Sequence, residues 1–104
     1  MQMRALLMAC AVTGVTVTLL GSPMARADDA SFVSETQALG FQQASDNLIS
    51  TARSACYFLS RDRDPGQITK RVMRYHNVEL DPAQRFLVLS VIEYCPQFRE
   101  RIGV

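Results

Sequence analysis

The chain has 104 residues, with 11 Lys and Arg, 10 Asp and Glu, and one His. This length suits one compact domain and excludes a multidomain enzyme. The formal net charge is +1, and residues 28–104 alone carry nine basic and ten acidic residues. A balance this close to neutral gives no electrostatic basis for binding nucleic acid or an anionic lipid surface.

Residues 1–27 have the pattern of a secretory signal peptide. Arg4 precedes an apolar stretch over residues 5–20, after which Gly21-Ser22-Pro23 is expected to break the helix and Ala25-Arg26-Ala27 supplies a small-x-small ending. This pattern predicts cleavage after Ala27. A transmembrane anchor is the alternative, but the apolar stretch is shorter than the roughly 20 residues that span a bilayer. A lipid-modified Cys10 is a weaker alternative, because bulky Met8 stands where a small residue is usual.

In residues 28–104 the apolar residues recur at helical spacing, which predicts an all-α domain of four helices. The first helix is expected after Asp28-Asp29, with Phe32, Val33 and Leu39 facing inward, and to end near Gly40. The second is expected from about Ala44 to Ser60. Its inner stripe comprises Leu48, Ala52, Ala55, Cys56 and Leu59.

The third and fourth helices have the same start signal, in Asp64-Pro65-Gly66-Gln67 and Asp81-Pro82-Ala83-Gln84. Each offers an acidic N-cap, a proline at the first helical position and a glutamine at the third. The third helix is expected to end near Asn77 and to bury Ile68, Val72 and Tyr75. It turns three basic residues outward: Lys70, Arg71 and Arg74.

The fourth helix runs to Cys95 and is apolar on nearly every side except at Arg85, Ser90 and Glu93. Two explanations are open. Either this helix is central, with Phe86, Leu87, Val91 and Tyr94 meeting one neighbour and Val88, Leu89 and Ile92 meeting another, or the second group forms a docking patch.

Only two cysteines, Cys56 and Cys95, remain after cleavage of the signal peptide. An even count in an exported small domain predicts a disulfide between them, with two buried free thiols as the alternative. The bridge would close a loop of about 40 residues, worth roughly 4 kcal/mol in the chain-entropy model. It would join the core stripe of the second helix to the end of the fourth, where Pro96 stops the helix.

Taken together, these residues resemble the small exported mycobacterial proteins grouped as domain of unknown function 732. The matching features are Asp28-Asp29 with Phe32, Leu39-Gly40-Phe41, Cys56, Leu80 before Ala83 and Phe86, and the closing Tyr94-Cys95-Pro96. The chain departs from the pattern in the charged loop Arg61-Asp62-Arg63-Asp64. The resemblance implies a helical, disulfide-bonded, exported domain without assigned activity, so no catalytic residues carry over.

The chain itself shows no catalytic set, metal site or cofactor site. His76 is the only histidine, no nucleophile-elbow motif is present, and Asp62-Arg63-Asp64-Pro65-Gly66 lacks the distal glutamate of a calcium loop. Met73 and His76 together are thin evidence for haem or copper. We expect His76 to interact with the helix dipole at the end of the third helix.

The sequence therefore favours a non-enzymatic exported interaction module at the cell envelope or outside the cell. Its candidate partner-facing residues are the apolar Val88, Leu89 and Ile92 and the basic Lys70, Arg71 and Arg74. The alternative is a carrier of a small ligand, lipid or haem, in an apolar pocket between the second and fourth helices. An exported hydrolase using a serine and His76 is the least favoured hypothesis.

Overall fold

The computed structural model describes residues 21–104, with side chains from Asp29 onward. In chain order the elements are α2 (Gly21–Ala38), α3 (Ser45–Ser60), α4 (Pro65–His76), α5 (Leu80–Tyr94) and the 3-10 helix η1 (Pro96–Ile102). The predicted all-α class with four α-helices is confirmed. The apolar core of the predicted signal peptide, over residues 5–20, lies outside the described residues. Within residues 21–104, no helix has both the length and the apolar character needed to cross a membrane.

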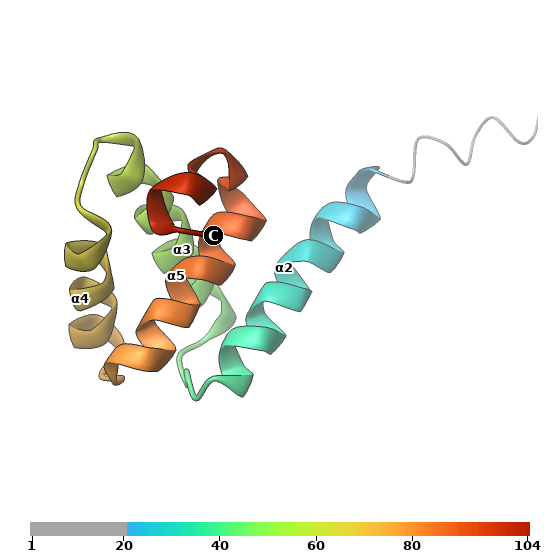
Figure 1. The fold of residues 1–104 in the computed structure, drawn as a ribbon. Helices are drawn as coiled ribbons and strands as arrows, with labels where there is room; N and C mark the ends of the chain where they lie inside the picture. The colour runs from blue at the N-terminus through green and yellow to red at the C-terminus, as the bar shows by residue number, and fades with distance from the viewer. Residues whose placement is uncertain (1–20) are drawn as a thin grey trace, which may run out of the picture.

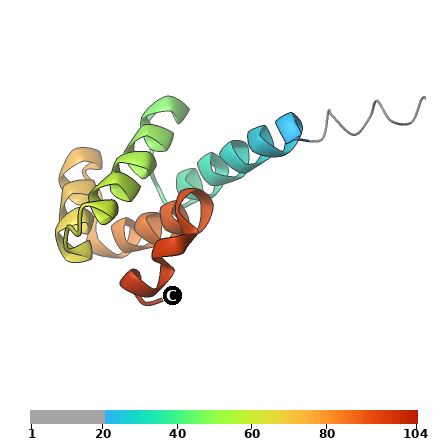
Figure 2. The ribbon, with the colours of Figure 1, turned by 90° about the horizontal axis from the view of Figure 1, so that it is seen from above.

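Helix α5 is the centre of the domain, because it packs against each of the other described helices. In Figures 1 and 2 it lies between α4 on one side and α2 on the other, with α3 packed alongside. Phe86, Leu87 and Val91 of α5 are buried. The first of the two explanations for its apolar character, a central position, therefore holds for this face.

Helix α2 begins earlier than expected, at Gly21 instead of after Asp28-Asp29. The residues before Gly21 lie outside the described part of the chain, so the expected break at Gly21-Ser22-Pro23 stays a prediction; Pro23 lies in the first turn of the described helix. At its other end, the chain turns at Gly40 with a φ of 105°, a region that a side chain disfavours. Phe32 is buried as predicted, and Val33 and Leu39 are half-buried against the core.

Helices α3 and α4 follow the predicted bounds closely. Ala44 is the N-cap residue of α3, and the predicted inner stripe is buried apart from Cys56, which is half-buried. The Asp64 carboxylate accepts a hydrogen bond of 3.2 Å from the Gln67 amide, so it caps α4 as its sequence motif indicated. Asn77, in the left-handed conformation, terminates α4.

Two expectations for α4 and α5 are wrong. Tyr75 is 66% exposed, because the buried face of α4 runs through Ile68, Val72 and His76, and adjacent residues on a helix point about 100° apart. Asp81 is not the N-cap of α5: the cap is Glu79, and Asp81 lies in the first turn, 3.0 Å from the guanidinium of Arg85. Pro82 also lies in the first turn of α5, where a backbone N–H would have no helical acceptor, so the helix tolerates the proline.

The core consists of two apolar clusters, and residues of α3, α4 and α5 belong to both. The first is built around aromatic rings: Phe86 stacks on Phe41 at a centroid distance of 4.7 Å and meets Phe32 edge-on at 5.5 Å. The second cluster comprises Ala55, Leu59, Ile68, Leu87, Val91 and Cys95. Ser90 is also buried, contrary to its expected place on a polar side, because its hydroxyl donates to the Phe86 carbonyl oxygen one turn back.

The predicted disulfide joins Cys56 in α3 to Cys95 just after α5, with an S–S distance of 2.07 Å and a Cα–Cα distance of 5.9 Å. It links the last turns of two helices that already pack together. Both cysteines belong to or border the second core cluster. The disulfide is therefore structural, and its bonded sulfurs are not available as thiolate nucleophiles.

Asp29, the second residue after the predicted cleavage site, is hydrogen-bonded to Tyr94 at the C-terminal end of α5. The Tyr94 hydroxyl donates to the Asp29 carboxylate, and the Arg53 guanidinium lies 5.1 Å from the centre of the Tyr94 ring. Burial and the hydrogen bond to the Asp29 carboxylate raise the pKa of Tyr94 well above its ordinary value. Asp29 is thus part of the folded domain, and the start of the exported chain at Asp28 stays a prediction.

Candidate functional site

One hollow of the described chain, with a mixed apolar and basic lining, lies between α3 and α4. It has a volume of about 380 Å³. Ser50, Thr51, Ser54, Ala55 and Phe58 line it from α3, and Ile68, Arg71, Val72, Arg74 and Tyr75 line it from α4. We call this hollow the α3–α4 groove.

The groove has an apolar floor and a polar rim. Ala55, Ile68 and Val72 are buried core residues, so they form the floor. Ser50 and Ser54 are exposed along the α3 side, whereas Tyr75 and the arginines are exposed along the α4 side. A surface that combines apolar area with directed polar groups is suited to binding a partner.

A second hollow of about 290 Å³ adjoins the groove and is lined by Arg63, Gln67, Lys70, Arg71 and Arg74. Every charged residue that lines either hollow is basic. The guanidinium groups of Arg63 and Arg71 lie over the Phe58 ring, 4.9 and 4.7 Å from its centre. Such cation–π contacts hold the two charges beside the apolar floor. The predicted basic residues Lys70, Arg71 and Arg74 are thus brought together on one wall.

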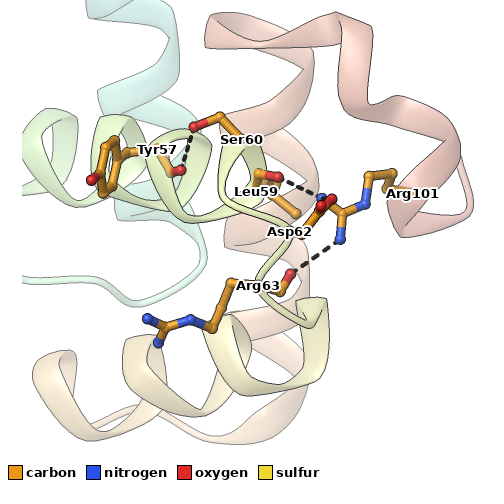
Figure 3. A network of polar contacts seen from close by, with 6 residues as sticks. All are labelled: Tyr57, Leu59, Ser60, Asp62, Arg63 and Arg101. Carbon is orange, nitrogen blue, oxygen red and sulfur yellow. Dashed lines mark hydrogen bonds and ion pairs between the residues drawn. The ribbon is translucent and has the colours of Figure 1, made fainter.

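Arg101 holds the loop that carries Arg63. As Figure 3 shows, its guanidinium donates to the carbonyl oxygens of Leu59 and Arg63, the latter at 3.2 Å, and lies 3.6 Å from the Asp62 carboxylate. Asp62 itself has a φ of 62°, so the loop makes a sharp reversal between α3 and α4. Sequence reasoning missed Arg101, because a lone arginine in a charged C-terminal segment gives no local signal of its distant acceptors.

His76 lies behind the groove and not on its surface. It is the last residue of α4 but only 4% exposed, and its Nε2 is 3.0 Å from Thr51 Oγ1 across the α3–α4 interface. Burial lowers the pKa of His76, which disfavours the protonated ring that an interaction with the helix dipole requires. The expectation of a dipole interaction is therefore wrong, and His76 acts as a neutral link between the two helices.

The contact between Thr51 and His76 pairs a hydroxyl group with an imidazole. A nucleophile and its base are ordinarily accompanied by a third group that orients the base. Here the buried His76 Nδ1 has no hydrogen-bond partner among the described residues. The same part of the chain holds no cluster of three or more His, Cys, Asp or Glu side chains that would fit a metal ion.

The predicted apolar patch of α5 lies on a different side of the molecule. Val88 and Leu89 line a hollow of about 490 Å³ between α2 and α5, with Glu35, Leu39 and Asp81 among its other residues. Val88 and Leu89 are half-buried, and Ile92 is 48% exposed. These three residues are therefore only partly covered by the fold. Since α5 separates α2 from α4 in Figures 1 and 2, this apolar surface and the basic wall do not form one site.

The pocket expected between the second and fourth helices, for a carried ligand, is not among the hollows of the described chain discussed above. Those hollows are lined by α3 with α4, by α4 with its preceding loop, and by α2 with α5. Helices α3 and α5 instead pack directly against each other and are joined by the disulfide. Their side chains fill the space that the carrier hypothesis needs.

Comparison with known proteins identifies a family for most of the chain. Residues 27–97 match the family model described as protein of unknown function (DUF732), a segment that starts at the predicted cleavage site and ends just after Cys95. No curated protein and no solved structure matches the chain. Because the matched segment covers well over half of the sequence and includes both cysteines of the disulfide, the chain belongs to the DUF732 family.

Proposed function

We propose that this protein is a non-enzymatic interaction module that is exported to the cell envelope or beyond and binds a partner through the α3–α4 groove. The observation that carries the proposal is the groove itself, an apolar floor of core residues beside a wall whose charged groups are all basic. Exposed apolar surface with a polar rim is typical of a protein–protein binding site.

Export is supported by the disulfide, since bridges of this kind form in oxidising compartments outside the cytoplasm. The segmented pattern of residues 1–27 supports the same location. A non-catalytic role is supported by the position of His76, which is buried and whose Nδ1 has no hydrogen-bond partner among the described residues. Both cysteines are bridged, so neither is available as a thiolate nucleophile.

The second candidate is the carriage of a small apolar ligand, such as a lipid or haem. A volume of about 380 Å³ places the α3–α4 groove in the lower range of small-ligand sites, which favours this candidate. Serine and threonine hydroxyls on one side and arginines on the other nevertheless give the groove a partly polar lining. A ligand site of that size usually buries most of its ligand against apolar side chains. The groove therefore fits a protein surface better than an enclosed apolar molecule.

The proposal is tested by site-specific photo-crosslinking of the exported, oxidised protein in the envelope fraction. A photoreactive residue replaces Ser54 on the groove rim, and a matched one replaces Ser34, which is exposed on α2. We expect a protein adduct from position 54 that position 34 does not give. Identical adducts from both positions, or a lipid adduct alone at position 54, would contradict a protein-binding groove.

A further inference from the structure

The shape and charge of the α3–α4 groove specify a class of partner more narrowly than the proposed function does. We propose that the groove binds an acidic amphipathic α-helix of a partner protein. This inference rests on the proposed function and adds the secondary structure and the charge of the bound segment.

The length of the groove fits two turns of a helix. Its α3 side runs from Ser50 to Phe58, and its α4 side runs from Ile68 to Tyr75. At a rise of 1.5 Å per residue these sides are roughly 10 to 12 Å long, which is about two helical turns. A bound helix therefore places side chains at positions i, i+3 or i+4, and i+7 along the floor, the spacing of helix-in-groove recognition.

The α3 side is built from small residues that allow a close approach. Ser50, Ser54 and Ala55 are spaced so that two short hydroxymethyl groups and a methyl group face the groove. At one end of the groove the exposed Tyr75 offers aromatic surface to a partner side chain, whereas Phe58 at the other end is half-buried and carries Arg63 and Arg71 over its ring. Aromatic side chains that stand exposed beside an apolar floor are typical anchors of an interface.

The charge of the groove requires an acidic partner. Arg71 and Arg74 line both the groove and the adjoining hollow, where Arg63 and Lys70 add two further cations. The α3 side contributes hydroxyl groups and no charge. A matching helix has apolar residues on the face that meets the floor of the groove. Its Glu or Asp residues lie beside that face and point toward the basic residues of α4. A basic helix would place like charges in contact along the whole of α4.

An anionic lipid surface fits these observations less well. The basic residues form a narrow wall beside an open groove, and the whole chain has a formal net charge of only +1. Attraction to a bilayer typically depends on clusters of about four to eight basic residues, and the four of this wall are at the lower end of that range. The hydroxyl groups of the groove would also lie against acyl chains without acceptors. Anionic vesicles are therefore the appropriate competing probe.

The test uses a synthetic, fluorescently labelled helical peptide of about 15 residues, with Leu at i, i+4 and i+7 and Glu at the flanking positions. Binding to the oxidised protein is measured by fluorescence anisotropy. Two control peptides accompany it, one with Lys in place of Glu and one with the same composition but the leucines spread around the helix. We expect saturable binding of the acidic amphipathic peptide alone, weakened at high salt because the contributing charges are exposed.

Variants then locate the binding surface. Ser54→Trp fills the groove and Arg74→Glu reverses a charge on its wall; each should weaken binding about tenfold or more, since that is the size of one good interfacial contact. Ser34→Trp and Arg99→Glu are matched controls outside both hollows and should leave binding unchanged. Circular dichroism confirms that each variant is folded.

Four outcomes would overturn the inference. The first is that the acidic peptide fails to bind, and the second is that it binds no better than its two control peptides. The third is that anionic phospholipid vesicles bind the protein, that Arg74→Glu weakens this vesicle binding, and that the peptide does not bind. Dimerisation of the protein through the groove, detected as a concentration-dependent mass that Ser54→Trp abolishes, would identify a second copy as the occupant and also refute it. A position-specific crosslink from residue 54 without peptide binding would leave the proposed function standing and remove only the acidic helix.

Discussion

The disulfide accounts for a large part of the stability of this domain. Cys56 and Cys95 are 39 residues apart, and closing a loop of that length removes unfolded-state entropy worth about 4 kcal/mol in the chain-entropy model. At roughly 0.05 to 0.15 kcal/mol per residue, a domain of residues 28–104 has a net stability of about 4 to 12 kcal/mol. Reduction should therefore remove between a third and the whole of that stability.

Urea denaturation followed by far-UV circular dichroism, with and without a reductant, measures this loss. For a slope of about 1 to 1.5 kcal/mol/M, typical of small domains, the midpoint should fall by about 3 M, or the reduced protein should be unfolded in buffer. The double variant Cys56→Ala, Cys95→Ala should behave like the reduced protein and should not respond to the reductant. A loss below about 1 kcal/mol on reduction would refute the loop-closure reasoning, since it would show that the reduced chain retains the same constraint by other means.

Three further predictions concern single residues. Arg101→Ala should lower the free energy of unfolding by about 1 to 2 kcal/mol, because it leaves the carbonyl oxygens of Leu59 and Arg63 without their charged donor. Arg99→Ala in the same 3-10 helix should cost little, and urea denaturation midpoints compare the two variants. Gly40→Ala should cost about 1 kcal/mol or more, because the backbone there has a φ of 105°, and thermal unfolding measures it. Because burial lowers the pKa of His76 in the folded state, its contribution is complete above the ordinary pKa of 6.5 and is lost as the pH falls below it. The wild-type protein should lose more stability between about pH 7.5 and 5.5 than His76→Gln does, and equal losses in parallel urea titrations would contradict this.

The parts of the fold that are set by neighbouring residues were predictable. The apolar stripe of α3 and the Asp64 cap of α4 follow from helical periodicity and from one hydrogen bond between residues three apart. The disulfide followed from the number of cysteines and the expected compartment. The stripe and the cap are specified by residues close together in sequence. The disulfide is specified because two cysteines can pair in only one way.

The features that were missed depend on contacts between distant segments. His76 is buried because Thr51 of another helix offers it a hydrogen bond, and its polar character gave no sign of this. Tyr75 is exposed because the inward face of α4 is rotated by a single residue position from the one expected. The α3–α4 groove also required the relative placement of two helices. The basic residues of its wall were identified in sequence, but the apolar floor beside them was not.

The C-terminal segment ties this groove to the stability of the domain. The disulfide fixes the end of α5 to the last turn of α3, and η1 then folds back so that Arg101 reaches the carbonyl oxygens of Leu59 and Arg63. The same loop presents the Arg63 guanidinium to Phe58, at the end of the groove. A covalent bond and a set of hydrogen bonds therefore act on one end of α3. Because Arg101 holds the loop between α3 and α4, Arg63 is preorganised at the end of the basic wall, and the proposed partner helix would bind without the entropy cost of ordering that loop.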